Sequence, residues 1–471
     1  MISFLSIVRL TVKNALRSHI FQLLMVLLLL CIFLIPNTIV GDDTAHGYIQ
    51  IALKYSLGTV SFILSLSAIW LGCFLMCSDT ENYQLHMVVS KPISRVTIWL
   101  GKYCGILLIH IFLMVFACTI IYGTVLWQFN RQNFTDQEKA KIQNEVLVGR
   151  RVYYPNNPNI RKAAYKKLEA QNAKKREKGQ DIDTSPATQR RELRMIQNDI
   201  LRNIGEIKYN SLRSWEYSNL PIGMDKERPI FLRWRTYVNK VSSEDQRMTR
   251  GMWAVWVAAP KTEEDKNSPA EQQFYQVPLS SQPEQFLTGV FHEKVLKATC
   301  IQDSGKVKIA FLNVDPKASG LFFQPKDGPK LLIKISGFSE NFFRGMIVMF
   351  IQLAVLAGLA CAAASAMSMP TAVFIVISYL MFGSFATFMA GTSFFGSAAD
   401  HIGYTVGNIL LMIVIPIQSF EVSPFIANGE LIEMSYIWGV IWKYLILRGL
   451  PIYLFGIWLY WRRELGLVIK K

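Results

Sequence analysis

Residues 77–105 read CSDTENYQLHMVVSKPISRVTIWLGKYCG, a short, partly charged segment that joins two long apolar runs. The runs, Leu57–Met76 and Tyr103–Leu126, are each long enough to cross a bilayer, since about 20 helical residues span ~30 Å of hydrocarbon. Within the segment, apolar residues recur at helical spacing up to Pro92, and Ser94-Arg95 opens a second amphipathic stretch. An amphipathic element at the mouth of two spans is typical of a docking site for a soluble partner. An ordinary basic loop that only orients the spans is the alternative.

Apolar blocks of spanning length recur along the 471 residues, of which 51% are hydrophobic, with a mean hydropathy of +0.24. Four of the six blocks carry neither charge nor histidine, which favours spanning helices over helices of a soluble core. The third block carries His110, for which we expect neutral packing. A shorter apolar piece within residues 404–420 is predicted to be re-entrant or interfacial. The six blocks are Phe21–Val40, Leu57–Met76, Tyr103–Leu126, Met346–Met367, Ala372–Met389 and Tyr436–Trp461.

The sixth block also carries two cations, Lys443 and Arg448. A central intramembrane charge costs about 2.5–3.5 kcal/mol on insertion scales, so such a residue is a functional candidate by default. Arg448 is that candidate here, and outward snorkelling of its side chain is the alternative.

The net charge of +16 does not indicate nucleic-acid binding, because its distribution follows membrane topology. Residues 127–342 hold 36 of the 50 Lys+Arg and 25 of the 34 Asp+Glu, so 14 basic and 9 acidic residues remain for the apolar part. Those basic residues gather before the first block, in the segment after Met76 and at the C-terminus, and short loops rich in Lys/Arg stay inside. We therefore expect a multi-pass protein of the cell (inner) membrane with both termini in the cytoplasm and residues 127–342 outside it.

The composition of residues 127–342 predicts an inserted α+β domain, with a helical part over 135–210 and a β-sandwich over 229–336. Thr135 to Glu138 is a capping box, and Ser185-Pro186 opens a helix whose apolar residues step by three and four. That spacing predicts a seam for packing against another helix, in a stalk or against a partner. The seam residues are Leu193, Ile196, Ile200, Ile204 and Ile207.

Period-two patterns from Pro229 onward predict seven short strands, the last two joined by a hairpin at Pro325-Lys326-Asp327-Gly328. Four tryptophans are interpreted as structural core, with a ligand-stacking platform as the alternative: Trp215, Trp234, Trp253 and Trp256. Of the seven cysteines, only Cys300 falls in this domain, so it must hold together by packing rather than by disulfides.

Residues 1–18 place Arg9, Lys13 and Arg17 on one helical stripe beside apolar residues. The pattern favours an interfacial helix on the cytoplasmic side. A basic flank that only orients the first span is the alternative.

Lys91-Pro92-Ile93-Ser94-Arg95, followed by Leu100-Gly101-Lys102, resembles the coupling segment of ATP-binding-cassette (ABC) permeases of the type 2 exporter class. The final Trp461-Arg462-Arg463-Glu464-Leu465 and the Ile415-Pro416 pair resemble the same family, particularly the membrane subunits of transporters that serve nitrous-oxide-reductase maturation. The resemblance covers roughly residues 1–126 and 343–471. One departure is that Glu81 is followed by Asn82-Tyr83-Gln84-Leu85 rather than by the Glu-x-Gly-Thr-Leu pattern of many members, which leaves the substrate subfamily open.

The resemblance implies a permease of six spans, with a coupling segment over 78–102 and a second permease copy or homologue beside it. ATP and Mg²⁺ would be bound by a separate cytoplasmic ABC ATPase, so no cofactor is expected in this chain. The residues that would couple to that ATPase are Glu81, Lys91, Pro92, Ser94, Arg95, Gly101 and Lys102.

Motifs for other chemistries are missing from the sequence. It contains no G-x-x-x-x-G-K-[ST] nucleotide loop, no His-Glu-x-x-His and no Gly-x-Ser-x-Gly elbow. We therefore expect a chain without catalytic residues of its own, and not an enzyme. The rival hypothesis is a polytopic anchor that displays a binding or sensing domain and transports nothing.

Overall fold

The computed structural model describes residues 2–38, 44–81, 93–131, 134–156, 160–177, 179, 185–222, 229–238, 248–258, 274–316, 320–324, 327–391 and 398–462. The chain forms two compact units. The first comprises residues 1–149 and 335–471, and the second comprises residues 150–334. The first unit is helical and the second is rich in β-strands; each has a hydrophobic core of its own.

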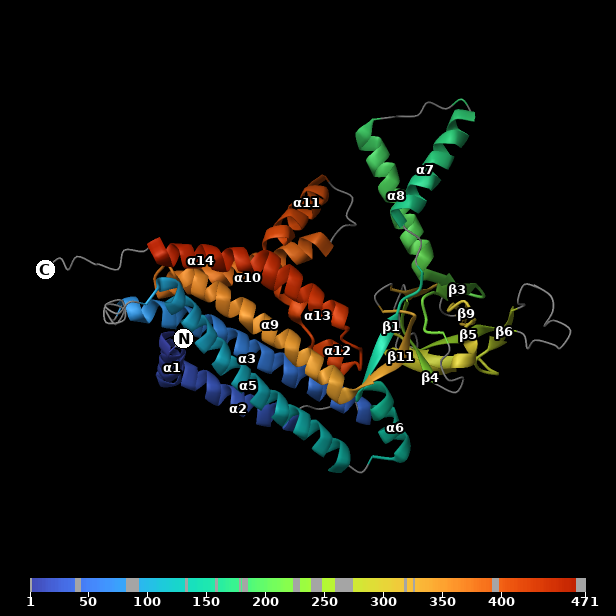
Figure 1. Cartoon of the computed structure of the whole chain (residues 1–471). Helices are drawn as coiled ribbons and strands as arrows, with labels where there is room; N and C mark the ends of the chain where they lie inside the picture. Colours follow the sequence, from blue (N-terminus) through green and yellow to red (C-terminus); the bar gives the residue numbers. More distant parts are fainter. Residues whose placement is uncertain are drawn as a thin grey trace. The chain divides into compact units, whose positions relative to one another are not determined.

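Six helices of the described residues are long and apolar enough to cross a membrane, at the places of the six predicted blocks. The six are α2 (His19–Thr38), α3 (Ala45–Glu81), α5 (Arg95–Arg131), α9 (Phe338–Ala364), α10 (Met369–Gly391), and a last helix built from α13 (Met434–Val440), the π-helical segment η5 (Ile441–Gly449) and α14 (Leu450–Arg462). Three of them, α3, α5 and α9, lie side by side (Figure 1). The shorter elements are α1 (Ile2–Arg17), α6 (Asp136–Glu145), α11 (Ala398–Ile413), the 3₁₀ turn η4 (Ile417–Phe420) and α12 (Ser423–Ala427).

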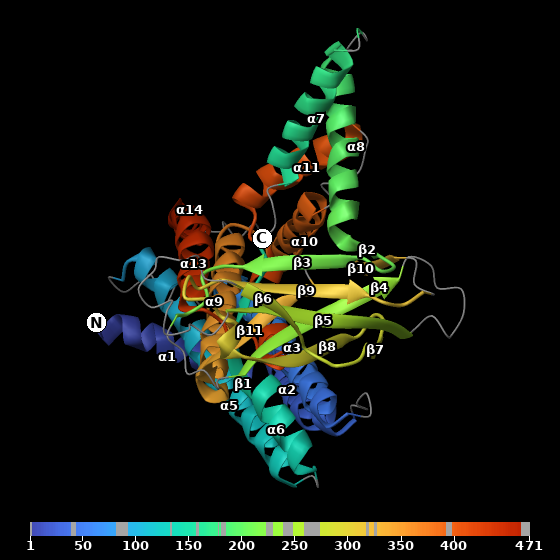
Figure 2. The ribbon, with the colours of Figure 1, turned by 90° about the vertical axis from the view of Figure 1, so that its right-hand side faces the viewer.

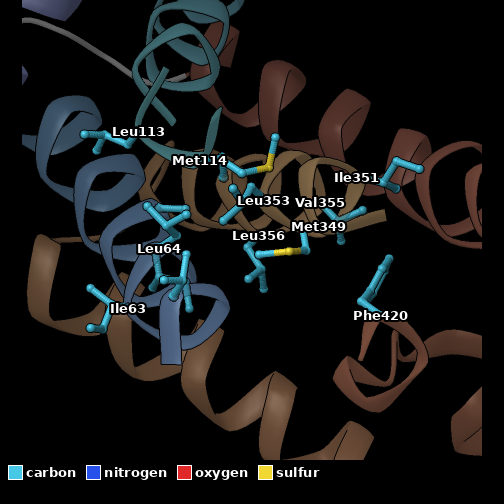
Figure 3. Close-up of a cluster of buried hydrophobic side chains, with 14 of the residues drawn as sticks. Ile63, Leu64, Leu113, Met114, Met349, Ile351, Leu353, Val355, Leu356 and Phe420 are labelled. Carbon is cyan, nitrogen blue, oxygen red and sulfur yellow. The ribbon is translucent and has the colours of Figure 1, made fainter. Parts of the chain in front are cut away.

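Helix α9 lies at the centre of the first unit and packs on α3, α5, α10 and α14. Its second half is rich in alanine and contains Gly358, which lets neighbouring helices approach closely. Larger apolar side chains along the same helix contribute to the core. Figure 3 shows Leu353 of α9 close to Leu64 of α3 and Met114 of α5, and all three are buried.

Several helix ends in this unit differ from the predicted ones. Helix α3 starts at Ala45, twelve residues before the predicted apolar block Leu57–Met76, and α5 extends to Arg131. Helix α6 has the predicted capping box at Thr135. The predicted inserted domain includes this helix, but it belongs to the first unit, because Ile142 on its apolar face is fully buried in that unit's core. The β-rich unit accordingly runs from 150 to 334 rather than from 127 to 342.

The predicted re-entrant or interfacial stretch 404–420 comprises most of α11 and the turn η4. Helix α11 has 16 residues, about 24 Å at the helical rise, and packs along α10. It is too short to span alone, as predicted, but its helix starts earlier, at Ala398.

The second unit is a sandwich of two sheets around one apolar core (Figure 2). One sheet has the order β1-β11-β4-β10-β2 with β8 also on β4, and the other has β3-β9-β5-β6 with β7 also on β5. The chain therefore enters through β1 and leaves through its sheet neighbour β11. The strands are β1 (Val148–Tyr153), β2 (Glu206–Lys208), β3 (Leu212–Tyr217), β4 (Pro229–Val238), β5 (Met248–Ala258), β6 (Phe274–Pro278), β7 (Glu284–Leu287), β8 (Phe291–Lys297), β9 (Val307–Asn313), β10 (Gly320–Phe323) and β11 (Lys330–Gly337).

The tryptophans form the centre of the sandwich core, which confirms the structural interpretation for three of the four. Trp253 is 1% exposed, and its ring centroid lies 5.0 Å from that of Trp234 and 5.8 Å from that of Trp215. Trp256 is different: it is half-buried, and the Lys308 ammonium lies 4.8 Å from its ring centroid.

Two strand predictions are wrong. The period-two pattern predicts one strand over Phe286–Leu296, but this segment splits into β7 and β8 because Gly289 takes a left-handed backbone conformation, with φ +78°. The hairpin is also absent, because β10 and β11 both pair antiparallel with β4 and so run in the same direction. The Asp327 carboxylate between them accepts hydrogen bonds from Arg235 and Tyr237 of β4, each at 2.6 Å, and so fixes the connection to that strand.

The helical part of the second unit is a pair, α7 (Ile160–Glu177) and α8 (Pro186–Gly205), which stand side by side in Figure 2. The ion pairs Lys167–Asp199 (2.7 Å) and Lys175–Glu192 (2.9 Å) set them antiparallel. Leu193, Ile196 and Ile200 form the predicted seam with α7. Ile207 does not belong to it, since the helix ends at Gly205 and Ile207 is buried in the sandwich core as part of β2.

Candidate functional site at the start of helix α5

The predicted coupling residues separate into a described and an undescribed group. Glu81 is the last residue of α3, but its side chain lies outside the described part of the chain, as do Lys91 and Pro92. The other four residues are at the start of α5. The stretch 95–102, predicted as a separate amphipathic element, is continuous with the spanning helix. The described coupling residues are Ser94, Arg95, Gly101 and Lys102.

Ser94 starts α5. Its Oγ accepts a hydrogen bond from the backbone N–H of Thr97 at 3.2 Å, so one of the unpaired N–H groups of the first turn is satisfied. Arg95 follows and donates from Nη1 to the carbonyl of Trp461 at 2.7 Å. Because Trp461 lies in the last turn of α14, the Ser-Arg pair links the start of α5 to the end of the last helix.

Gly101 and Gly105 face helix α1. A Cβ on Gly101 would lie 2.8 Å from Cγ2 of Ile7, and one on Gly105 would lie 2.8 Å from Cβ of Thr11. Both distances are shorter than any ordinary carbon contact, so glycine is required for this close approach. The spacing is the small-xxx-small pattern that brings helices together in membranes. Gly101 is thus a packing residue.

Lys102 is buried, with 4% of its surface exposed. Its Nζ donates to the carbonyl of Leu75 in α3 at 2.6 Å. A buried ammonium is stabilised by such charge-assisted bonds. Lys102 therefore joins α5 to α3 from inside the bundle and presents little surface to a docking partner.

Helix α1 has a buried face and an exposed one. Ile7, Thr11 and Ala15 are buried and include the residues opposite the two glycines. The apolar stripe predicted for this helix, Leu5, Val8, Val12 and Leu16, divides between the faces: Val8 is buried, whereas Leu5 and Leu16 are 69% and 50% exposed. The exposed leucines lie on the same outward side as Arg9, Lys13 and Arg17. Apolar side chains beside cations are typical of a helix in a membrane interface.

The start of α5 contacts three other helices within about two turns. Arg95 donates to the end of α14, Gly101 packs against α1 and Lys102 donates to α3, whereas the Ser94 hydroxyl caps α5 itself. Within the described residues, no group of three or more His, Cys, Asp or Glu side chains is placed to hold a metal ion.

Arg448 lies in the π-helical segment and contacts protein. Its Nη1 donates to the carbonyl of Val414 at 2.9 Å, just beyond the end of α11. The Tyr379 hydroxyl donates to the neighbouring Ile413 carbonyl at 3.2 Å. Carbonyls at a helix end lack intrahelical donors, so away from water they need a donor from another part of the protein. The Arg448 guanidinium supplies that donor to the carbonyl of Val414. Lys443, by contrast, is exposed.

A polar layer in the middle of the helical unit was not predicted, apart from His110. His110 is fully buried, with Nδ1 2.8 Å from the Ile106 carbonyl and Nε2 3.2 Å from Oγ of Ser67. On α3, close to Ser67 in the sequence, Ser61 donates to Gln352 of α9 at 3.2 Å, and Gln352 donates to Ser65 at 2.9 Å. Uncharged serine and glutamine do not interrupt an apolar block, so only a search for polar residues within the spans would have found them.

Comparison with known protein families, with curated proteins and with solved structures finds no match for this chain. The resemblance to ABC permeases therefore depends on the sequence motifs alone.

Proposed function

We propose that this chain is the membrane-spanning permease subunit of an ABC exporter of the type 2 class. A separate cytoplasmic ATPase binds ATP and Mg²⁺ and docks on the segment from Glu81 to Lys102. A second permease copy or homologue completes the transport unit, and the β-rich unit 150–334 lies on the extracytoplasmic side. Closure of the ATPase on nucleotide biases the bundle between two arrangements.

The observation that carries the proposal is the bond from Arg95 to the Trp461 carbonyl. It connects the segment proposed to receive the ATPase with the last of the six candidate spans. With Gly101 on α1 and Lys102 on α3, a force applied before α5 acts on the bundle as a whole. A loop that only orients two spans would not require these contacts with α1, α3 and α14.

The test is co-purification of the ATPase from detergent extracts, with ATPase activity of the reconstituted complex. Arg95→Ala should weaken co-purification or uncouple hydrolysis from transport. Replacing Lys470 and Lys471, which are also basic, by alanine should do neither. Arg95→Lys, which keeps a positive charge and N–H donors on a long side chain, should preserve more of both activities than Arg95→Ala.

Equal behaviour of the Arg95 and Lys470/Lys471 variants would reduce the segment to a topological anchor. If no ATPase co-purifies with the unchanged protein under any nucleotide condition, the polytopic-anchor hypothesis replaces the exporter.

The orientation has its own test in a cysteine-free background. Ser94→Cys should resist an impermeant thiol reagent in intact cells. Tyr165→Cys, on α7 and 45% exposed, should react once any outer membrane is permeabilised. Labelling of Ser94→Cys at the rate of Tyr165→Cys would reverse the proposed orientation.

A further inference from the structure

A cavity of about 210 Å³ lies between α3, α9 and residues 417–423 of the connector that follows α11. That volume is more than ten times the roughly 10–15 Å³ that a single water needs. The cavity is in the first unit, about midway along both long helices: Gln352 is roughly 21 Å from Phe338 at the helical rise. Its polar lining residues are Ser61, Ser65, Gln352, Gln418, Glu421 and Ser423.

The inner wall of the cavity is a buried hydrogen-bonding surface. Gln352, Ser65 and Ser423 are each 5–6% exposed. The amide of Gln352 donates to Ser65 and accepts from Ser61. An amide has two N–H donors and two acceptor lone pairs, so these two bonds leave capacity on the amide. Polar groups at this depth of an apolar bundle are costly to bury, which indicates a functional use.

The rim of the cavity is amphipathic. Phe62, which is 68% exposed, and Met349 provide apolar surface. Glu421 and Gln418 are exposed beside them. Among the described residues that line the cavity, Glu421 is the one that carries a charge. A ligand that enters therefore meets apolar side chains, a carboxylate and several oxygen acceptors.

The connector that closes the cavity is held in place by the last helix. The Tyr436 hydroxyl donates to the Ser419 carbonyl at 2.6 Å, and the Tyr444 hydroxyl lies 2.8 Å from Ser419 Oγ. Both tyrosines belong to the helix whose end contacts Arg95. The cavity wall is thus a fixed surface, and pre-organisation of this kind favours binding.

We propose that this cavity binds an amphiphile with a protonated amine and an apolar tail. An ammonium has three donors and no acceptor, which matches a site of serine, amide and carboxylate oxygens. The Glu421 carboxylate attracts the cation, and the exposed Phe62 ring offers a further cation–π contact. The tail extends past Phe62 and Met349 towards the lipid side. An anionic head of the same size is repelled by Glu421.

The test uses three probes with one tail: dodecylamine, dodecanol and dodecanoate. The full chain, free of native cysteines and carrying Ser61→Cys, is reconstituted in lipid nanodiscs at pH 7, where an alkyl amine is protonated. The rate at which a small thiol reagent modifies the cysteine is measured with and without each probe. Because head-group charge alters partition into the lipid, the three probes are compared at equal measured concentration in the nanodiscs, so the remaining differences report the cavity.

Dodecylamine should slow modification at least tenfold at saturation, with dodecanol less effective and dodecanoate least. Glu421→Gln should remove the preference for the amine over the alcohol. Glu433→Gln, a carboxylate on the same connector that does not line the cavity, should keep it.

Equal protection by the amine and the carboxylate, or a preference that survives Glu421→Gln, would overturn the proposal. A cysteine that no reagent modifies would do so too, because the cavity would then be closed to ligands. The measurement needs no ATPase, so its outcome is independent of the proposed function.

Discussion

Replacement of Trp253 by alanine should destabilise the sandwich far more than the same change at Trp256, three residues along the same strand. Trp253 is 1% exposed, with ring centroids of Phe311 at 4.8 Å and Trp234 at 5.0 Å. Truncation of a buried tryptophan costs about 3–5 kcal/mol. Trp256 is half-buried and loses mainly its contact with Lys308, about 0.5–1 kcal/mol for an exposed cation–π pair.

The two variants can be compared by urea unfolding of a fragment of residues 150–334, which has a core of its own. With a slope of about 2 kcal/mol/M, the midpoint should fall by about 2 M for Trp253→Ala and by no more than about 0.5 M for Trp256→Ala. Cys300 serves as the probe, because it is the one cysteine of the fragment and is 4% exposed. Burial raises the pKa of its thiol to about 12, so it should react at pH 8 only after unfolding.

Equal midpoint shifts for the two variants would refute the assignment of Trp253 to the core. Reaction of Cys300 with a thiol reagent at the unfolded rate in the absence of urea would show that the fragment has no cooperative fold.

Two further predictions concern the helical unit, and both are measured as thermal unfolding of the purified protein in detergent. Gly105→Val should displace α1 and lower the free energy of unfolding by about 1–3 kcal/mol, because the larger side chain overpacks against Thr11. Gly123→Val on the same helix should not, because a Cβ there meets no atom within 4 Å; equal melting temperatures for the two variants would contradict the close contact with α1. Arg448→Leu should lower the free energy of unfolding by about 1–3 kcal/mol, because the Val414 carbonyl loses its guanidinium donor, whereas Lys443→Leu should change it little. Similar, small changes for both variants would favour outward snorkelling of the Arg448 side chain.

The candidate spans were predictable because length and apolarity suffice to define them. The bounds of α3 were not, because its first turns contain Lys54 and other polar residues that end an apolar block without ending a helix. Local capping signals held at Thr135 and at Ser185, whose Oγ accepts from the N–H of Thr188. Such signals involve residues three apart and need no knowledge of the fold.

Longer-range features were beyond a single sequence. The Pro325–Gly328 turn signal predicted a hairpin, but the pairing of both flanking strands with β4 overrode it. The positive charge of Lys102 favoured a docking role, and only the fold reveals that its ammonium lies against α3. Gly101 and Gly105 form a small-xxx-small pattern whose partner, α1, is almost 100 residues earlier in the chain, so the contact cannot be predicted from the local sequence.

Because β1 and β11 are neighbours in one sheet, the β-rich unit begins and ends at the same place and forms a self-contained insertion, here called the cassette. A domain whose first and last strands are sheet neighbours can be inserted into a loop in one genetic step, because its two ends lie close together. By the same geometry, removal of residues 150–334 and closure by a short turn should leave a six-helix chain. Related chains that lack the cassette, or carry another one in its place, are therefore expected in evolution.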